Sequence, residues 1–540
     1  MRADLSAITE TAFDVIIIGA GINGAGVARD AAMRGLKVLL LDKGDIASGT
    51  SAWSTRLIHG GLRYLEHGEL GLVRESLRER ERLLRIAPHL VRPLPMLIPV
   101  YRQGRRGLLT IRAGMFAYDV LSFDKSLKRH RLLSVAETLQ RVPGLSREGL
   151  RGAALYYDAQ VEYAERLVLE NVLSATGHGA RVLTHARVDK FIVEAGVVRG
   201  VILTDLPGGR AASARAALVV NAAGPWVDEV LGHAPGPPAR LIGGTKGSHL
   251  VVKGFAGAPA DALYVEAQED ARPFFIIPWN GLYLIGTTDL PYDGDLDQVE
   301  AAEGEIDYLL RETNRVIASA GLSRDSILYT YSGVRPLPYH AASEPASITR
   351  RHFIRDHAPG GLISIVGGKL TTYRHLSERV VDLLFKKLGR ESPACPTARL
   401  RLPGASTENF AEFRAQFKAE SGLPPAVAER LLGIYGTRAA EVLELAGDDS
   451  ELRRPFSPAT GAIGAEVLIS FRRELAETLA DCLLRRTMAG LGAAAGLDAV
   501  EAAARIALKH LGWDETRAAR EVNAYREYVR RFHPRNSGRA

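Results

Sequence analysis

Residues 13–24, FDVIIIGAGING, are the strongest indication of the fold class. The stretch begins as a short β-branched run, typical of a buried parallel strand, and passes directly into glycines spaced as G-x-G-x-x-G. The next residues, 25–35 (AGVARDAAMRG), have helical spacing and a glycine where a helix would end. A second strand, KVLLLD, follows at 37–42. This order of strand, glycine turn, helix and strand predicts the βαβ unit of a dinucleotide-binding domain.

Each part of this unit has a physical role. Gly19 allows a tight turn, Gly21 lets the backbone approach a pyrophosphate, and Gly24 permits close packing of helix on strand. The helix N-terminus offers free N–H groups and a positive dipole to the pyrophosphate. An acid at the end of the second strand is placed to bind a ribose hydroxyl. The cofactor-binding residues expected here are Gly19, Gly21, Ile22, Asn23, Gly24 and Asp42. The unit by itself leaves NAD and FAD open.

Composition limits the alternatives. A chain of 540 residues is expected to form two or three domains, and its formal charge of +7 favours anionic ligands or an acidic surface. The two cysteines, Cys395 and Cys482, form neither a disulfide framework nor a metal cluster, so no metal is expected. The first residues lack the apolar core of a signal peptide, and no apolar run is long enough to span a bilayer. A second dinucleotide fingerprint is absent from the sequence, which argues that a flavin here takes hydride from a bound substrate.

The sequence after Asp42 identifies a family. Residues 50–66, T-S-x-x-S-T-R-L-I-H-G-G-L-R-Y-L-E, resemble the flavin-side signature of the FAD-dependent glycerol-3-phosphate dehydrogenases, and residues 14–26 resemble the first signature of that family. Trp53 stands where that signature has a small residue. Further matching blocks are VNAAGPWV (220–227), KGSHLVV (246–252), FIIPW (275–279), IGTTD (285–289), YSGVRPL (331–337), GGKLTTYR (367–374) and DCLLRRT (481–487).

The resemblance implies an α/β fold of the D-amino-acid-oxidase type. Its discontinuous Rossmann-like FAD domain is expected near 13–85, 150–235 and 350–390. An antiparallel β-sheet substrate cap is expected near 90–150 and 240–345, with alternating runs such as GSHLVVKG suited to half-buried strands. A Pro-containing linker is expected at 391–404 and an α-helical domain at 405–540.

The resemblance also implies a reaction. The family oxidises sn-glycerol 3-phosphate to dihydroxyacetone phosphate by hydride transfer to the flavin N5 of non-covalently bound FAD. Oxidation of an alcohol also needs a base, which is His249 by resemblance, with Lys369 as the alternative. Arg335 is expected near the carbinol oxygen, and Arg63 and Arg350 at the phosphate, because a guanidinium fork matches phosphate oxygens. Also expected are Tyr64 and Thr371 at the substrate, and Thr50, Ser51, Ser54, His59, Gly60, Gly61, Leu62, Val188, Ala223, Gly224, Asp289, Gly368 and Lys369 at the cofactor.

The expected electron acceptor is membrane quinone, as in a respiratory chain. Residues 93–121 mix arginines with apolar side chains, so we expect this stretch to be a peripheral or monotopic anchor on an anionic membrane surface, on the cytoplasmic side of the plasma membrane. A homodimer is possible, and the sequence has no recognised nucleic-acid-binding module. The alternatives are a glycerol-3-phosphate oxidase using oxygen, an amine or amino-acid oxidase of the same fold, and a flavin-binding regulatory or tRNA-associated protein.

Overall fold

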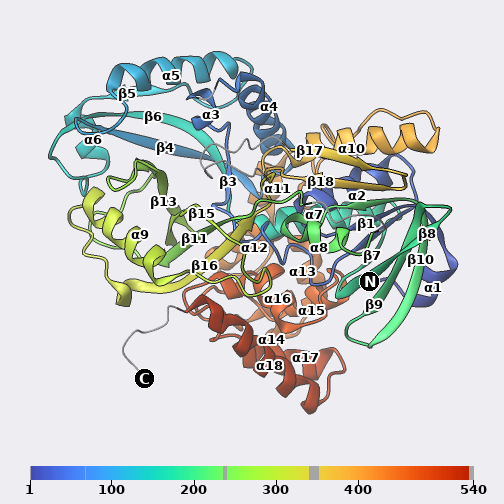
Figure 1. Cartoon of the computed structure of the whole chain (residues 1–540). Helices are drawn as coiled ribbons and strands as arrows, with labels where there is room; N and C mark the ends of the chain where they lie inside the picture. The colour runs from blue at the N-terminus through green and yellow to red at the C-terminus, as the bar shows by residue number, and fades with distance from the viewer. Residues whose placement is uncertain (1, 67, 235–239, 340–351, 534–540) are drawn as a thin grey trace.

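The chain folds into three parts, seen side by side in Figure 1. The computed structural model describes residues 2–66, 68–234, 240–339 and 352–533, without the side chains of Arg63 and Glu66. One sheet with its helices lies at the right of the view, a second sheet at the left, and the C-terminal helices below them. This arrangement confirms the predicted FAD-type α/β fold with a cap sheet and a helical C-terminal domain.

The first sheet is parallel at its centre. Strand β1, the predicted FDVIII strand, pairs in parallel with β10 on one side and β2 on the other. It is buried because both faces of a central parallel strand are covered. The strand order is β17 (Phe353–His357), β18 (Leu362–Val366), β10 (Arg210–Asn221), β1 (Ala12–Ile18), β2 (Val38–Leu41) and β7 (Arg181–Leu183), with β9 (Val197–Asp205) on the first half of β10 and β8 (Ala186–Glu194) on β9.

Helix α2 (Ile22–Met33) lies between this sheet and two further helices, α7 (Ala164–Gly177) and α10 (Tyr373–Leu388). It is buried almost all round, which explains its small side chains. A Cβ at Gly26 would lie 2.4 Å from Ser377 Oγ of α10, so a larger residue there would push the helices apart.

The second sheet has ten strands and is mainly antiparallel. Its order is β15 (Leu290–Pro291), β11 (Thr245–Val252), β14 (Leu282–Gly286), β13 (Pro273–Trp279), β12 (Ala262–Glu266), β4 (Val91–Tyr101), β6 (Leu150–Val161) and β3 (Leu57–Ile58), with β16 (Ile327–Arg335) on β11 and β5 (Arg131–Leu133) on β6. Strand β6 lies in this sheet although residues 150–161 were expected in the FAD domain, because β6 pairs with β4 from Val91–Val161 to Tyr101–Leu150.

Strand β11 is buried on both faces, so the expectation of a half-buried strand was wrong. Leu250 and Val252 pack against helix α9 (Glu303–Val316), while Val251 lies in a core with Tyr329 and Tyr331. The alternation in GSHLVV therefore separates two buried environments rather than core from solvent.

The stretch 93–121, expected as one anchor, divides into two elements. Residues 93–101 belong to β4, in the middle of the cap sheet, so this half of the prediction was wrong. The other half forms helix α5 (Leu108–Leu121), at the top of the view in Figure 1, above the sheet and next to α4 (Leu70–Ile86). Within 93–121, most of the exposed residues lie in α5 and in the loop before it, so a contact with another surface is expected there.

The C-terminal part is helical, as predicted. It contains α11 (Phe410–Glu420), α12 (Pro425–Tyr435), α13 (Ala439–Ala446), α14 (Ser450–Arg453), α15 (Ala465–Arg472), α16 (Leu479–Arg485), α17 (Val500–His510), α18 (Glu515–Val529) and the 3-10 turn η6 (Arg530–Phe532). The smaller helices elsewhere are α1 (Leu5–Glu10), α3 (Arg63–Glu66), α6 (Val135–Arg141) and α8 (Val227–Leu231). Within the described ranges, we find no helix with the length and apolar character that crossing a membrane requires.

Candidate active site

Four parallel strands of the first sheet end at one edge, and the predicted cofactor residues lie there. Gly19 follows β1, Asp42 follows β2, Ala223 follows β10 by two residues, and Gly368 follows β18 by two. The carboxyl ends of parallel strands form the binding edge of open α/β sheets. The topology thus joins segments that are far apart in the sequence.

A cavity of about 670 Å³ opens at this edge. Its size suits an organic cofactor. The predicted residues on its wall are Gly19, Gly21, Ile22, Asn23, Asp42, Thr50, Ser51, Ser54, Val188, Ala223, Gly224, Gly368 and Lys369. The other predicted cofactor residues, Gly24, His59, Gly60, Gly61, Leu62 and Asp289, are not among the lining residues.

The backbone of the first glycine turn fits a dinucleotide. Gly19 has φ +106°, and a Cβ at Gly24 would lie 1.8 Å from Gly19 O, so both positions require glycine for the turn itself. Gly21 differs, because among the described residues its Cβ would meet only Ser51 Oγ, at 3.3 Å. Side chains at the cavity also have unused polar atoms, since Asn23 Oδ1 and Trp226 Nε1 are buried without hydrogen-bond partners among the described residues. These features match a phosphate-bearing, polar ligand.

Asp42 has a second role besides the predicted one. Its carboxylate accepts hydrogen bonds from Ala20 N at 2.6 Å and Gly44 N at 2.8 Å, which fixes the loop around the glycine turn. Burial raises the pKa of Asp42, and these two N–H donors oppose that rise. Each carboxylate oxygen retains a lone pair that can accept from a ribose hydroxyl.

The predicted flavin segment is bonded to helix α2 and to the cap sheet. Ser51 Oγ accepts from Ile22 N of α2 at 3.0 Å, and Thr50 Oγ1 donates to Val334 O of β16 at 2.6 Å. Tyr331 Oη donates to Ser54 O at 2.9 Å. The loop therefore forms a rigid wall between the glycine edge and the cap sheet.

His249 lies on the cap sheet, next to the loop that forms this wall. It is buried on β11, its Nε2 lies 3.0 Å from Thr55 Oγ1, and its ring stacks on Tyr331 at 4.7 Å between centroids. A Cβ at Gly286 would lie 2.6 Å from His249 Cδ2, so glycine there makes room for the ring. Burial lowers the pKa of His249 well below its usual value, and the positive charges of Arg335 and Arg56 lower it further. The imidazole is therefore uncharged near neutral pH, as a base must be.

Arg335 reaches over the same face of the cap sheet as His249. A Cβ at Gly247, two residues from His249 on β11, would lie 2.3 Å from Arg335 Nη2. Arg335 Nη1 lies 2.9 Å from Asp289 Oδ1, which balances its charge. Neither Arg335 nor Asp289 is among the cavity-lining residues, so the structure places them in an ion pair beside the cavity.

Lys369 lies on the cavity wall with its ammonium 3.9 Å from the centroid of the Tyr64 ring. Thr371 Oγ1 accepts from His59 N at 3.2 Å. The structure thus brings Tyr64 and Lys369 together at the cavity wall, and their roles at a substrate stay a prediction. Arg350 lies outside the described residues, and so does the side chain of Arg63.

The cavity wall includes residues that the sequence did not indicate. Trp226 lies inside the matched block 220–227, and its large polar aromatic ring was a usable signal. Tyr528, Arg531 and Phe532 come from the end of the described chain, where a helical pattern of mixed charges gave no sign of a cofactor.

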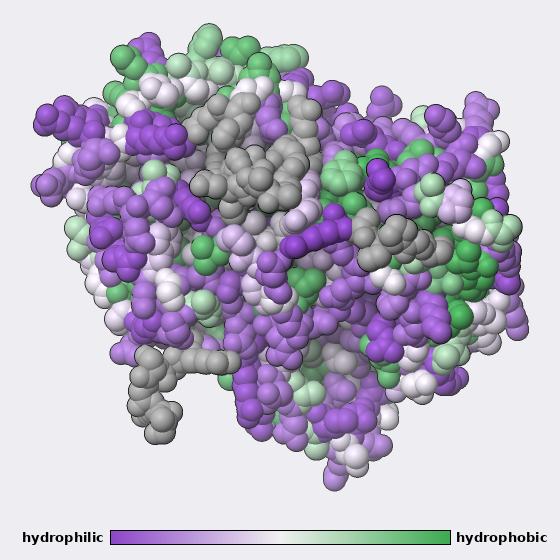
Figure 2. Space-filling view, viewed as in Figure 1, coloured by the Kyte–Doolittle hydropathy of each residue, from purple (hydrophilic) through white to green (hydrophobic). Residues whose placement is uncertain are grey.

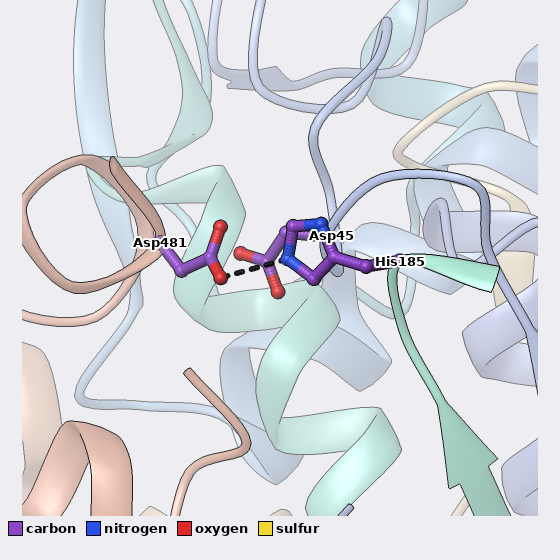
Figure 3. Close-up of side chains that lie close together, drawn as sticks. All are labelled: Asp45, His185 and Asp481. Carbon is purple, nitrogen blue, oxygen red and sulfur yellow. Dashed lines mark hydrogen bonds and ion pairs between the residues drawn. The ribbon is translucent and has the colours of Figure 1, made fainter. Parts of the chain in front are cut away.

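The block DCLLRRT joins the C-terminal helices to the FAD loop. Figure 3 shows Asp45, His185 and Asp481 meeting, the first from the loop after β2, the second between β7 and β8, and the third from α16. Asp45 Oδ1 and Oδ2 accept from Arg486 at 2.7 and 2.9 Å. Asp45 Oδ2 also accepts from Arg485 Nε at 2.6 Å. We call these five residues the Asp45 cluster. Its two guanidinium groups already satisfy the carboxylates, so the cluster acts as an ion-pair junction between domains.

The cluster predicts a pH-dependent stability. Burial lowers the pKa of His185, but the charge and hydrogen bond of Asp481, 2.9 Å from Nε2, outweigh burial and raise the pKa above its usual value. A raised folded-state pKa stabilises the fold fully below the unfolded value near 6.5, and the gain is lost as pH rises through the folded pKa. His185→Gln should therefore cost about 1.5–3 kcal/mol at pH 6 and clearly less at pH 9, measured by denaturant unfolding. His178→Gln is the control, and an equal loss at both pH values would contradict this role.

Comparison with known proteins agrees with this geometry. Residues 14–374 match the FAD dependent oxidoreductase family, and residues 395–518 match the C-terminal domain of alpha-glycerophosphate oxidase. The chain is 48% identical to a glycerol-3-phosphate dehydrogenase of Synechocystis sp., covering 97% of each chain. It is 35% identical to an aerobic glycerol-3-phosphate dehydrogenase of Staphylococcus haemolyticus, covering 88% of this chain and 86% of that one.

A solved structure is similar over the whole length. The glycerol-3-phosphate dehydrogenase from Bacillus halodurans complexed with FAD has a TM-score of 0.80 at 29% identity, covering 98% of this chain and 97% of that one. The glycine edge, the cavity and the sequence matches thus point the same way. The chain belongs to the FAD dependent oxidoreductase family and, within it, to the glycerol-3-phosphate dehydrogenases.

Proposed function

We propose that this protein oxidises sn-glycerol 3-phosphate to dihydroxyacetone phosphate at FAD and passes the electrons to membrane quinone. The observation that carries the proposal is the pairing of a dinucleotide-binding edge with a buried imidazole, His249, that contacts Thr55 of the flavin segment. The relatives named for this reaction span nearly the full chain, which supports the substrate.

Different residues are proposed to hold the cofactor, to accept the proton and to attract the substrate. Gly19, Gly21 and Asp42 would hold the dinucleotide, and bound FAD supplies the hydride acceptor. His249, uncharged and bonded to Thr55 Oγ1, is the proposed base for the alcohol proton, with Lys369 as the second candidate. The positive field of Lys369 on the cavity wall favours an anionic substrate.

The test is direct reduction of the bound flavin. Glycerol 3-phosphate added without oxygen should bleach the flavin absorbance, whereas glycerol at the same concentration should not. A flavin that stays oxidised with glycerol 3-phosphate would overturn the substrate assignment. Adding a quinone analogue or air to the reduced protein then separates a quinone reductase from an oxidase, because only an oxidase reoxidises rapidly in air and releases peroxide.

A membrane contact through α5 would bring the flavin site close to the quinone in the membrane. In Figure 2, apolar side chains gather at the top of the molecule, where α5 lies. The exposed large apolar residues of α5 and of the loop after it are Leu109, Phe116, Val120 and Phe123. Leu109 is 81% exposed and Phe123 is 78% exposed. Arg102, Arg105 and Arg112 are exposed beside them, whereas Arg106 pairs with Glu266. Apolar side chains flanked by arginines suit the headgroup layer of an anionic membrane.

The buried side of α5 reaches toward the flavin segment. Tyr118 Oη accepts from Gly60 N at 2.9 Å and donates to Asp158. A membrane bound to the exposed face would therefore lie one helix away from the flavin signature, which supports a quinone entrance on this side.

Substitution of an exposed apolar residue of α5 should lower membrane binding and quinone reduction without changing the reduction of a soluble dye. Phe116→Glu should lower binding to anionic liposomes at least tenfold, because a buried Phe contributes about 1.5–3 kcal/mol. Quinone reduction in membranes should fall with it, and reduction of a water-soluble dye should not change, since α5 does not line the cavity. Leu400→Glu, at an exposed apolar residue outside α5, is the control. Unchanged liposome binding by Phe116→Glu would exclude α5 as the contact.

A further inference from the structure

The end of the described chain reaches the cofactor cavity. Tyr528 of α18, and Arg531 and Phe532 of η6, line it together with the glycine edge. Phe532 is 4% exposed, so it is part of the interior and not a trailing end. The helical C-terminal part thus supplies a portion of the cavity wall.

Phe532 is held between the flavin segment and the cap sheet. Its ring lies 5.2 Å from that of Trp53 and 6.5 Å from that of Tyr329. Thr330 Oγ1 of β16 donates to Phe532 O at 3.3 Å. Trp53, the residue that departs from the family signature, therefore has a structural partner at the far end of the chain.

Arg531 connects the same segment to the loop after β2. Its guanidinium lies 4.0 Å from the Tyr528 ring centroid, and Nη1 donates to Asp297 O at 3.2 Å. The Asp297 carboxylate in turn holds Lys43 at 2.8 Å, next to Asp42. Arg531 thus lies at the junction of the C-terminal segment, the cap and the nucleotide loop.

The C-terminal segment that contains Tyr528, Arg531 and Phe532 is also held by contacts away from the cavity. The Asp45 cluster fixes α16 to the loop that contains Lys43, and its members are largely buried. Glu521 of α18 accepts from Leu479 N of α16 at 3.1 Å, so the same junction holds α18. The wall formed by Tyr528, Arg531 and Phe532 is therefore fixed in place.

We propose that Tyr528, Arg531 and Phe532 are FAD-binding residues, and that the C-terminal segment closes the cofactor site. Aromatic faces and a guanidinium suit the planar rings and the negative charge of this cofactor. The proposal rests on FAD occupying this cavity, which belongs to the proposed function.

The test measures cofactor binding in the full-length protein. Phe532→Ala and Arg531→Gln should each weaken FAD binding at least tenfold in titrations of the apoprotein, and iodide should quench the bound flavin more strongly. Val529→Ala is the control, because Val529 is a buried apolar residue at the end of α18, directly before η6, and does not line the cavity. It should lower the melting temperature of the apoprotein about as much as Phe532→Ala, yet leave FAD affinity within threefold.

Two results would overturn the proposal. One is unchanged FAD affinity and quenching in both Phe532→Ala and Arg531→Gln. The other is an equal loss of FAD in Val529→Ala, which would assign the effect to packing alone. Failure of the proposed function has a different signature, since the parent protein would then not bind FAD or would not be bleached by glycerol 3-phosphate.

Discussion

A Gly21→Val variant is expected to purify folded but without the yellow colour of bound flavin. Gly21 is the N-cap of α2 with φ −71° and ψ −178°, a conformation that any residue adopts. Because its Cβ would meet only Ser51 Oγ in the part of the chain that the structure describes, at 3.3 Å, a small shift of this hydroxyl accommodates a side chain there. The valine would instead occupy the space that a pyrophosphate needs beside the helix N-terminus. FAD affinity should fall on the order of a hundredfold or more, measured by titrating the apoprotein.

The chain offers a closely matched control for this change. Gly107 is also a helix N-cap, with φ −76° and ψ 165°, and no atom of the described ranges lies within 4 Å of a Cβ built there. Gly107→Val should carry the same cost of about 1 kcal/mol for a β-branched N-cap and keep its flavin. A Gly21→Val protein that retains full flavin content would place the cofactor elsewhere.

His249→Asn should keep its flavin and lose most of its activity. Removal of a general base typically costs 10²–10⁴-fold in rate, and asparagine preserves a polar side chain opposite Thr55. The rate to measure is flavin reduction by glycerol 3-phosphate in single-turnover experiments. Since the pKa of His249 lies well below its usual value, the parent should stay active on the acid side to below pH 6.5.

Two further variants test the specificity of this prediction: one is a control histidine, and the other removes the alternative base. His357 of β17 also bonds a hydroxyl, with Nε2 2.9 Å from Ser364 Oγ, and His357→Asn should leave the rate within threefold. Lys369→Met tests the other candidate base. If His249→Asn keeps at least a third of the parental rate while Lys369→Met loses it, the lysine is the base.

The local sequence pattern was sufficient to predict the fold class. The strand 13–18, the glycine turn and the helix after it need only neighbouring residues to be recognised, and each is present. The matched block VNAAGPWV begins at the end of β10 in the same sheet. In the structure the carboxyl end of β10 lies beside Gly19, because Ala222 N donates to Ile18 O at 2.8 Å and the parallel strands share one binding edge.

Residues whose environment depends on distant partners were less predictable. The arginines and apolar residues of 93–121 indicated one amphipathic surface, but a strand in mid-sheet needs the apolar half for its core. The helical pattern near 528–533 carried no sign that Phe532 would meet Trp53, because that contact spans almost the whole chain. Arg335 was expected at the carbinol oxygen, but the sequence could not reveal its ion pair with Asp289.

The strand order of the first sheet has a consequence for biosynthesis. Strand β1 emerges first from the ribosome, yet its neighbour β10 ends at Asn221 and the next strand, β18, ends at Val366. Contacts between segments so far apart in sequence form late, after the intervening chain is available. The binding edge is therefore completed only when the chain has been synthesised at least as far as Val366. Flavin uptake should accordingly be a late event, and chains that terminate before β18 should be apoproteins with an exposed β10 edge, prone to aggregation.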